Sequence, residues 1–158
     1  MKEKTCCFTG HRTISPKVLP ALSCELETVL QDLIQKGIRY FGAGGALGFD
    51  TLAAQTVLRM KKQYPQIRLI LVLPCREQTK NWSKKDVQRY HSILQSADKV
   101  VYTTKHYTTS CMHRRNRHLI NHSCVCVAYC TRFTGGSAYT VRYAQQRGVP
   151  VIFLHPSP

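Results

Sequence analysis

GAGGALGFD, residues 42–50, joins a short apolar run to a segment with helical periodicity. The apolar run, 38–41, is typical of a buried strand, and 51–64 is predicted to be a helix. Four glycines at this junction allow a tight turn and leave backbone N–H groups open to a ligand. The helix start behind them favours an anion, because it carries unpaired N–H groups and partial positive charge. The stretch therefore predicts a site for a nucleotide or another phosphorylated ligand.

The glycine spacing differs from both common nucleotide-binding patterns. Gly42-x-Gly44-x-x-x-Gly48 is not G-x-G-x-x-G, and no acidic residue follows about twenty positions on to bind a ribose. The Gly-Lys-Ser/Thr end of a Walker A loop is also missing. A turn that serves only the packing of a strand against a helix is the competing interpretation.

Strand-like and helix-like segments alternate along the whole chain of 158 residues. Strands are expected at 5–9, 38–41, 67–73, 100–104, 124–129 and 149–154. Helices are expected between them, with Gly37 ending the first and Ser83 capping the third. The pattern predicts a single α/β, Rossmann-like domain over 1–158, with a mainly parallel sheet of about six strands and helices on both faces.

Ligands of such sheets bind at the carboxyl ends of the strands, near the switch in strand order. The loops that carry glycine or charge all follow predicted strands, at 10–12, 42–48, 74–82, 105–110 and 130–137. We therefore expect them along one edge of the sheet, and this convergence strengthens the hypothesis of a small-ligand site.

The candidate ligand-binding residues come from these loops and from the helix predicted at 111–121. Arg12 suits an anionic group through its bidentate fork. Trp82 and Tyr107 can stack on a base, although core packing explains Trp82 equally well. Asp50, the acidic residue beside the main glycine loop, can accept from a ribose, act as a base, or satisfy first-turn amides. The full set is Gly10, His11, Arg12, Gly44, Gly45, Gly48, Asp50, Trp82, Tyr107, Arg115, Asn116, Gly135, Gly136 and Ser137.

The net charge of +15 is distributed unevenly, since no acidic residue follows Asp98. A strongly basic half favours an anionic ligand or a nucleic-acid partner. A solvated basic face that aids solubility is the alternative.

Other features of the sequence argue against a membrane, secreted, disulfide-linked or metal-binding protein. The longest apolar run, 69–74, is too short for a bilayer, and the first residues lack a secretory pattern. We therefore expect a cytoplasmic protein without a membrane partner. The eight cysteines include no C-x-x-C pair, which favours buried free thiols over disulfides or zinc. His118 and His122 are four apart on one helix but lack a third ligand, so no metal is predicted.

Five segments together resemble a known family. They are CFTGHR at 7–12, GGALGFDTLAA at 44–54, LPC at 73–75 with Gln78 and Trp82, Tyr107 with RNR at 115–117, and GGS at 135–137 with Thr140 and Val141. In this order they resemble the YpsA-like (DUF1273) family of the SLOG superfamily, which also holds the LOG hydrolases and the DNA-processing protein DprA. The resemblance spans nearly the whole chain. It implies a Rossmann-like domain that binds a nucleotide or a derivative, such as AMP, ADP-ribose or NAD, at its glycine loops.

The chain departs from its LOG relatives at the position of their catalytic glutamate. LOG hydrolases share P-G-G-x-G-T-x-x-E, whereas 134–141 reads TGGSAYTV and offers no acid. Asn121 and Cys124 also stand where the resembled family usually has aspartate. A nucleotide-binding sensor or carrier is therefore the leading hypothesis. The alternatives are a nucleoside-phosphate hydrolase that relies on Asp50 and a DprA-like protein that binds single-stranded DNA. A homo-oligomer is left open.

Overall fold

The computed structural model describes residues 1–157, which form one sheet with helices on both faces. Its strands are β1 (Thr5–Gly10), β2 (Tyr40–Ala43), β3 (Arg68–Leu73), β4 (Lys99–Tyr102), β5 (Val125–Tyr129) and β6 (Val151–Phe153). They are all parallel, in the order β4-β3-β2-β1-β5-β6. Its helices are η1 (Lys2–Lys4), α1 (Leu19–Gln35), α2 (Phe49–Lys61), α3 (Lys84–Ser96), α4 (Cys111–Asn121) and α5 (Gly136–Gln146). The predicted α/β, Rossmann-like fold is confirmed.

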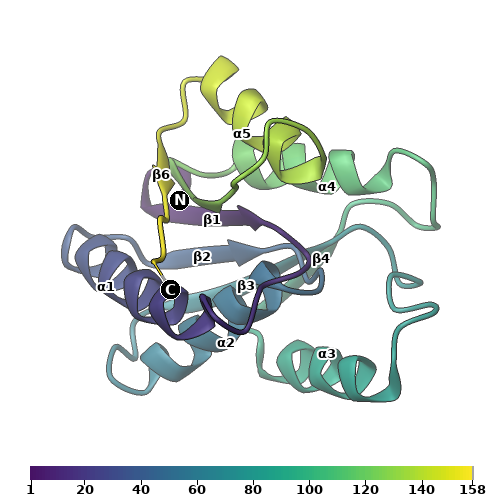
Figure 1. Ribbon diagram of the computed structural model, residues 1–158, viewed down its shortest axis with the longest axis horizontal. Coiled ribbons are helices and arrows are strands. Elements are labelled where there is room, and N and C mark those ends of the chain that lie inside the picture. Colours follow the sequence, from purple (N-terminus) through teal and green to yellow (C-terminus); the bar gives the residue numbers. More distant parts are fainter. Residues whose placement is uncertain (158) are drawn as a thin grey trace.

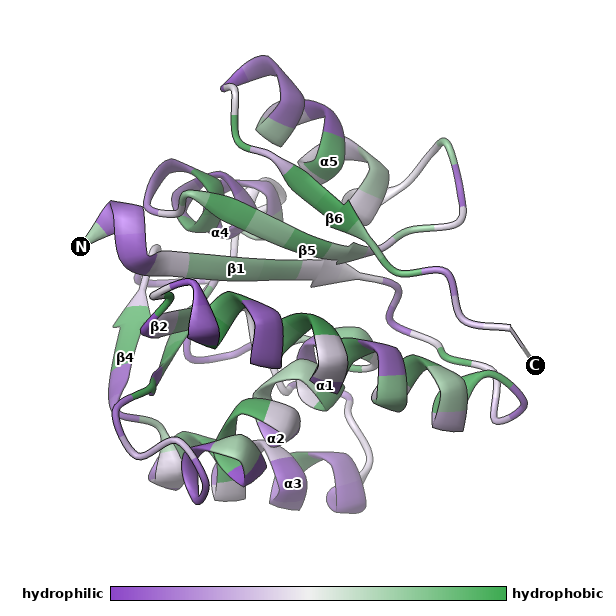
Figure 2. Ribbon diagram, turned by 90° about the vertical axis from the view of Figure 1, so that its left-hand side faces the viewer, coloured by the Kyte–Doolittle hydropathy of each residue, from purple (hydrophilic) through white to green (hydrophobic). Residues whose placement is uncertain are grey.

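The helices form two unequal layers (Figure 1). α1, α2 and α3 cover one face of the sheet, while α4 and α5 lie on the other. The first layer buries the larger core, in which the rings of Phe8 and Phe41 lie 6.2 Å apart. The second core is small and centres on Leu119 and Ile120 of α4. Figure 2 shows that the strands are mostly hydrophobic, whereas the helices on either side of them contain both hydrophobic and hydrophilic residues.

The order of the strands places a switch point between β1 and β5. The chain adds β2, β3 and β4 on one side of β1, then crosses through α4 to place β5 and β6 on the other. Loops that leave β1 and β5 therefore diverge, which opens a crevice at their carboxyl ends.

Two glycines allow the loop after β1 to lie directly against the start of α2. A Cβ at Gly10 would stand 2.5 Å from the ring of Phe49. A Cβ at Gly48, where φ is +77°, would stand 2.3 Å from the carbonyl oxygen of Arg12. This contact lets the Phe49 N–H donate to the His11 carbonyl at 3.0 Å, which fixes the loop after β1.

Several predicted boundaries are wrong by a few residues. β2 begins at Tyr40 because the Ile38 N–H still bonds back to Leu33 at the end of α1. α2 begins at Phe49, directly after the glycine turn, and ends at Lys61. The predicted cap of α3 is confirmed, since Ser83 Oγ accepts from the Asp86 N–H at 3.2 Å.

The cysteines are free thiols throughout residues 1–157, and most of them are buried. Cys24 is exposed on α1, however, and Cys124 and Cys130 are partly exposed, so the expectation of burial is wrong for these. Within the same residues, each helix is too short or too polar to cross a bilayer.

Candidate functional site

A cavity of about 550 Å³ lies at the carboxyl ends of β1 and β5, where the strand order switches. This volume is within the range of small-molecule sites. Its lining consists of Thr9, Gly10, His11, Arg12, Thr13, Ala46, Asp50, Thr109, Met112, His113, Arg115, Asn116, Arg132, Thr134, Gly135, Gly136 and Ser137. The lining therefore comes from the ends of β1 and β5, the glycine stretch, α4 and the start of α5.

The cavity brings together most of the candidate residues of the sequence. Those in its lining are Gly10, His11, Arg12, Asp50, Arg115, Asn116, Gly135, Gly136 and Ser137. Those outside it are Gly44, Gly45, Gly48, Trp82 and Tyr107. The ring of Trp82 packs edge-on against Tyr90 at 5.5 Å, which is the core-packing role weighed for it. Tyr107 is 59% exposed in the loop that precedes α4.

Arg115 explains why the glycines of the stretch stay outside the lining, to which only Ala46 and Asp50 of residues 42–50 belong. Its side chain is 4% exposed, and its guanidinium donates to the Gly44 carbonyl and, at 2.7 Å, to Asn116 Oδ1. A Cβ at Gly44 would stand 2.7 Å from Arg115 Nη1 and 2.8 Å from Asp50 Oδ2. Glycine is therefore required at this position because two charged side chains occupy the space. Gly44 thus makes room for Arg115 and does not line the open cavity.

Asp50 is the one acidic residue in the lining. It is 8% exposed and accepts the Ala46 N–H at 3.2 Å. Burial raises the pKa of Asp50, against the opposing effects of Arg115, the Ala46 N–H and Arg12. Burial likewise lowers the pKa of Arg115, and Asp50 opposes that change. The two side chains thus balance each other's charge under the glycine stretch.

His11 links the loop after β1 to the loop after β5. Its Nε2 accepts the Thr131 N–H at 2.8 Å, so Nδ1 carries the proton of the neutral ring. Nδ1 lies 3.4 Å from Ser137 Oγ and is therefore the donor in that contact. Burial, and then the charge of Arg132, lower the pKa of His11. In this tautomer His11 cannot take a proton from Ser137, so the pair does not form an activated nucleophile.

The start of α5 gives the cavity its anion-binding character. Gly135, with φ of +100°, precedes the helix and offers no side-chain cap. A Cβ at Gly135 or Gly136 would meet nothing within 4 Å, so the first-turn N–H groups are open to the cavity. The exposed side chains of Arg12 and Arg132 stand in the same lining. The N–H groups at the start of α5 and the two arginines together create a positive electrostatic potential in this part of the cavity.

Some lining residues were missed at the sequence level. Arg132 and Thr134 lie in a loop already expected at this edge, and only their side-chain positions were unknown. The places of Met112 and His113 in the lining could not be predicted, because they depend on how α4 packs against the sheet. His113 Nδ1 is buried without a hydrogen-bond partner within residues 1–157, so a polar ligand atom would satisfy it.

The predicted histidine pair of α4 lies away from this cavity. The rings of His118 and His122 stack 4.1 Å apart near the end of the helix. In the described part of the chain, no group of three or more His, Cys, Asp or Glu side chains is placed to hold a metal ion.

Comparison with known proteins now places the chain among relatives. Residues 9–151 match the model described as YspA SLOG family (YpsA). The chain belongs to this family.

The chain is also similar in sequence to the following two proteins. The SPbeta prophage-derived protein YoqJ of Bacillus subtilis is 31% identical over 150 residues, which cover 85% of this chain and 88% of YoqJ. A UPF0398 protein of Halalkalibacterium halodurans is 30% identical over 118 residues, covering 73% of this chain and 62% of that protein.

Solved structures support the same fold. DNA processing protein A from Streptococcus pneumoniae aligns with a TM-score of 0.71 and 15% identity, over 99% of this chain and 52% of that one. The Helicobacter pylori protein, whose structure concerns single-stranded DNA binding, aligns with a TM-score of 0.68 and 19% identity. It covers 99% of this chain and 67% of that one. At these identities the likeness shows a shared fold alone.

The buried Arg115 predicts a large loss of stability on substitution. In Arg115→Met, the Gly44 carbonyl loses its donor and Asp50 loses the cation that most strongly opposes the effect of its burial. We expect the free energy of unfolding to fall by about 3 kcal/mol, measured by urea denaturation. Arg114→Met, one residue earlier and exposed, is the matched control and should change it by less than about 0.5 kcal/mol. Equal effects of the two substitutions would contradict this role of Arg115.

The lowered pKa of His11 leads us to expect that the folded protein loses stability in acid. Because its folded pKa lies below the ordinary value of 6.5, the unfolded chain binds the proton more readily. Its stabilising effect is complete above about pH 6.5 and is lost as the pH falls through the folded pKa.

Unfolding measured at a series of pH values tests this. His11→Gln, which can still accept the Thr131 N–H but does not titrate, should lose less stability on acidification than the wild type. His91→Gln, exposed on α3, should follow the wild type. Parallel acid profiles for His11→Gln and the wild type would refute the assignment.

Proposed function

We propose that the protein binds a nucleotide or a nucleotide-derived ligand in the cavity between the ends of β1 and β5, as a sensor or carrier module. The observation that carries this proposal is the convergence of the uncapped α5 start with Arg12 and Arg132 in one lining. Membership in the SLOG family and the position at the switch point support it.

The α5 end of the cavity suits a phosphate group. Gly135 and Gly136 expose backbone N–H groups without side chains that would keep an anion away. Ser137 Oγ accepts from His11, which leaves its own hydroxyl proton free to donate to a phosphate oxygen. Arg12 and Arg132 add charge at exposed positions, where each side chain can reorient around the ligand.

The opposite wall suits the uncharged part of a nucleotide. Asn116 provides an amide for sugar hydroxyls, and His113 offers a ring nitrogen without a partner within residues 1–157. Two exposed aromatic side chains, Tyr107 at 59% and Phe133 at 95%, lie within two residues of lining positions Thr109 and Arg132. Such side chains are available for stacking on a base. AMP, ADP-ribose and NAD are therefore the first ligands to test.

Binding fits the site better than catalysis does. Hydrolysis of a nucleoside phosphate would depend on Asp50, because the lining offers no other carboxylate. That carboxylate already accepts the Ala46 N–H and balances the charge of Arg115. Asp50 is thus occupied in holding the glycine stretch, and His11 is the wrong tautomer to activate Ser137.

Thermal denaturation with a panel of nucleotides tests the proposal. At 100 times the dissociation constant, a ligand of the folded state adds about 2.7 kcal/mol of stability, which is a shift of several degrees. Arg132→Ala and Arg12→Ala should reduce the shift, since each removes a cation from the lining. Arg147→Ala, exposed on the turn after α5, is the control and should retain it. The proposal fails if no nucleotide raises the melting temperature, or if all three variants behave alike.

Binding of single-stranded DNA is a second candidate, favoured by one feature of the charge distribution. No Asp or Glu occurs after position 98. Within residues 1–157, the exposed lysines and arginines of this basic half also make no ion pair with an acidic residue. Arg114, Arg142 and Arg147 are exposed on or beside α4 and α5. This layer therefore presents positive charge that no neighbouring carboxylate neutralises.

Affinity for a single-stranded oligonucleotide should then fall steeply with salt. Each phosphate contact contributes a slope of about −0.7 in log K against log salt. In fluorescence anisotropy, Arg114→Glu with Arg142→Glu should weaken binding and flatten that slope. Lys62→Glu, exposed at the end of α2 on the other face, should do neither. Absence of binding at low salt would dispose of this second candidate.

A further inference from the structure

A second cavity, of about 310 Å³, lies on the face of the sheet that α4 covers only in part. Within residues 1–157, the main contacts of α4 with the sheet are to β1 and β3, and those of α5 are to β1, β5 and β6, so β4 is the strand that these helices cover least. Its lining is drawn from the amino-terminal residues, the face of β2, β3 and β4, and the last turns of α4. None of its residues lines the cavity at the carboxyl ends of β1 and β5.

The floor of this second cavity is apolar. Ile70 and Val72 of β3 point to this face, because their neighbours Leu69 and Leu71 point to the larger core. Val101 of β4 and Leu119 of α4 complete the floor. Ile70 and Val101 remain only half-buried, so the fold leaves apolar surface here that a ligand can cover.

The rim is basic. Lys2, Lys99, His118 and His122 surround the floor, and no acidic residue belongs to the lining. Burial, followed by the charges of His122 and Lys99, lowers the pKa of His118, as expected where positive groups gather. A second copy of this chain would bring like charges to the rim, which disfavours it as the occupant.

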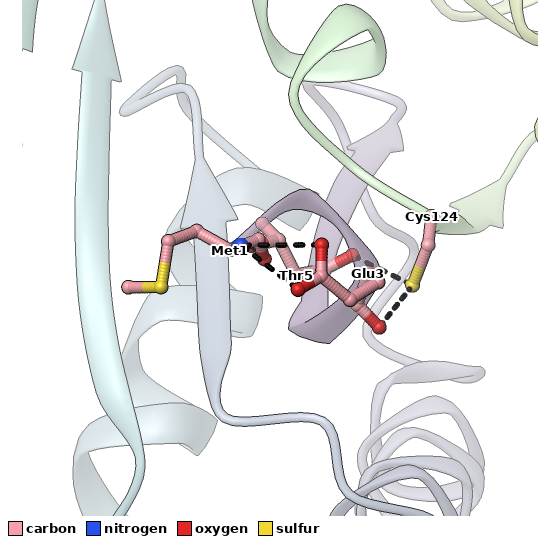
Figure 3. A network of polar contacts seen from close by, with 4 residues as sticks. All are labelled: Met1, Glu3, Thr5 and Cys124. Atoms are coloured by element: carbon pink, nitrogen blue, oxygen red, sulfur yellow. Dashed lines mark hydrogen bonds and ion pairs between the residues drawn. The ribbon is translucent and has the colours of Figure 1, made fainter.

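Met1, Lys2 and Thr5 belong to the lining, and the backbone of this segment is held in place by polar contacts (Figure 3). Thr5 Oγ1 donates to the Met1 carbonyl at 2.7 Å, and the terminal ammonium pairs with Glu3 at 3.1 Å. Cys124 Sγ lies 3.3 Å from the carbonyl oxygens of both Glu3 and Thr5, which can share its single S–H proton. The Met1 side chain extends away from this network and is 69% exposed, although it belongs to the lining. A flexible thioether of this kind can adapt to an apolar chain.

We propose that this second cavity binds a single-chain carboxylate, with the alkyl chain on the floor of Ile70, Val72, Val101 and Leu119 and the carboxylate at Lys99. The apolar floor and the basic rim supply the two halves that such an amphiphile needs. A volume of about 310 Å³ suits a small molecule rather than a long peptide. The site is separate from the proposed nucleotide site and does not depend on it.

Isothermal titration of decanoate into the full chain, without any extension before Met1, tests this proposal. We expect binding of one decanoate per chain below its micellar concentration. Acetate lacks the chain and decyltrimethylammonium reverses the charge, so neither should bind. AMP should not compete with decanoate, because we expect AMP to bind in the cavity at the carboxyl ends of β1 and β5.

Two substitutions locate the site. Lys99→Glu reverses an exposed rim charge and should weaken decanoate binding about tenfold. Val101→Glu places a carboxylate in the floor and should abolish it. If Val101→Glu does not fold, as judged by circular dichroism, the effect of Lys99→Glu on decanoate binding tests the location of the site.

Lys62→Glu carries the same change of charge on the other face of the sheet and should bind as the wild type does. The proposal is overturned if decanoate does not bind, if decyltrimethylammonium binds equally, or if Lys99→Glu and Lys62→Glu have the same effect. Dimerisation of the wild type that Lys99→Glu abolishes, without decanoate binding, would assign the face to a second copy instead.

Discussion

The buried guanidinium of Arg115 is the contact on which the proposed site depends. It reaches from α4, on one face of the sheet, to the Gly44 carbonyl at the carboxyl end of β2. Its charge is balanced by Asp50 at the start of α2, on the opposite face. A buried cation is tolerated only when such partners are present, so the three segments fix one another's positions. The wall of the cavity under Asn116 and Asp50 is a direct consequence.

The remaining walls follow from the parallel topology. β1 lies at the centre of the sheet beside β5, and the loops that follow these two parallel strands leave the sheet at the same edge. His11 then bridges the two loops through Thr131 and Ser137, which brings the start of α5 beside Arg12. A neutral His11 is needed for this bridge, because a protonated Nε2 cannot accept the Thr131 N–H. The same geometry that shapes an anion site thus excludes an activated serine.

The sequence predicts the fold well because the alternation of strands and helices is regular and the strands are apolar. It also predicts the edge of the sheet where the candidate residues gather, since parallel strands share one carboxyl edge. The roles of individual residues are harder to predict. Gly44 belongs to a stretch typical of ligand loops, yet its missing side chain accommodates Arg115 and Asp50. That contact joins residues 71 positions apart, and no local pattern records it.

Trp82 is a second residue whose role could not be predicted from the local sequence. Its position in a strand-end loop favours stacking on a base, whereas its ring packs on Tyr90 of α3. The uncovered face beside α4 was also not predicted, because the sequence does not say which strands a crossover helix spans. Long-range packing decides both cases, and it is visible only in the assembled sheet.

The central claim is that the start of α5 holds the anionic group of a nucleotide. Amide chemical shifts of ¹⁵N-labelled protein, recorded with AMP and with adenosine, test this most directly. The account predicts that AMP shifts the amides of Gly135, Gly136 and Ser137 most strongly, and that adenosine, which lacks the phosphate, leaves them nearly unchanged. Shifts at these amides that are equal for the two ligands, or shifts confined to other parts of the chain, would contradict it.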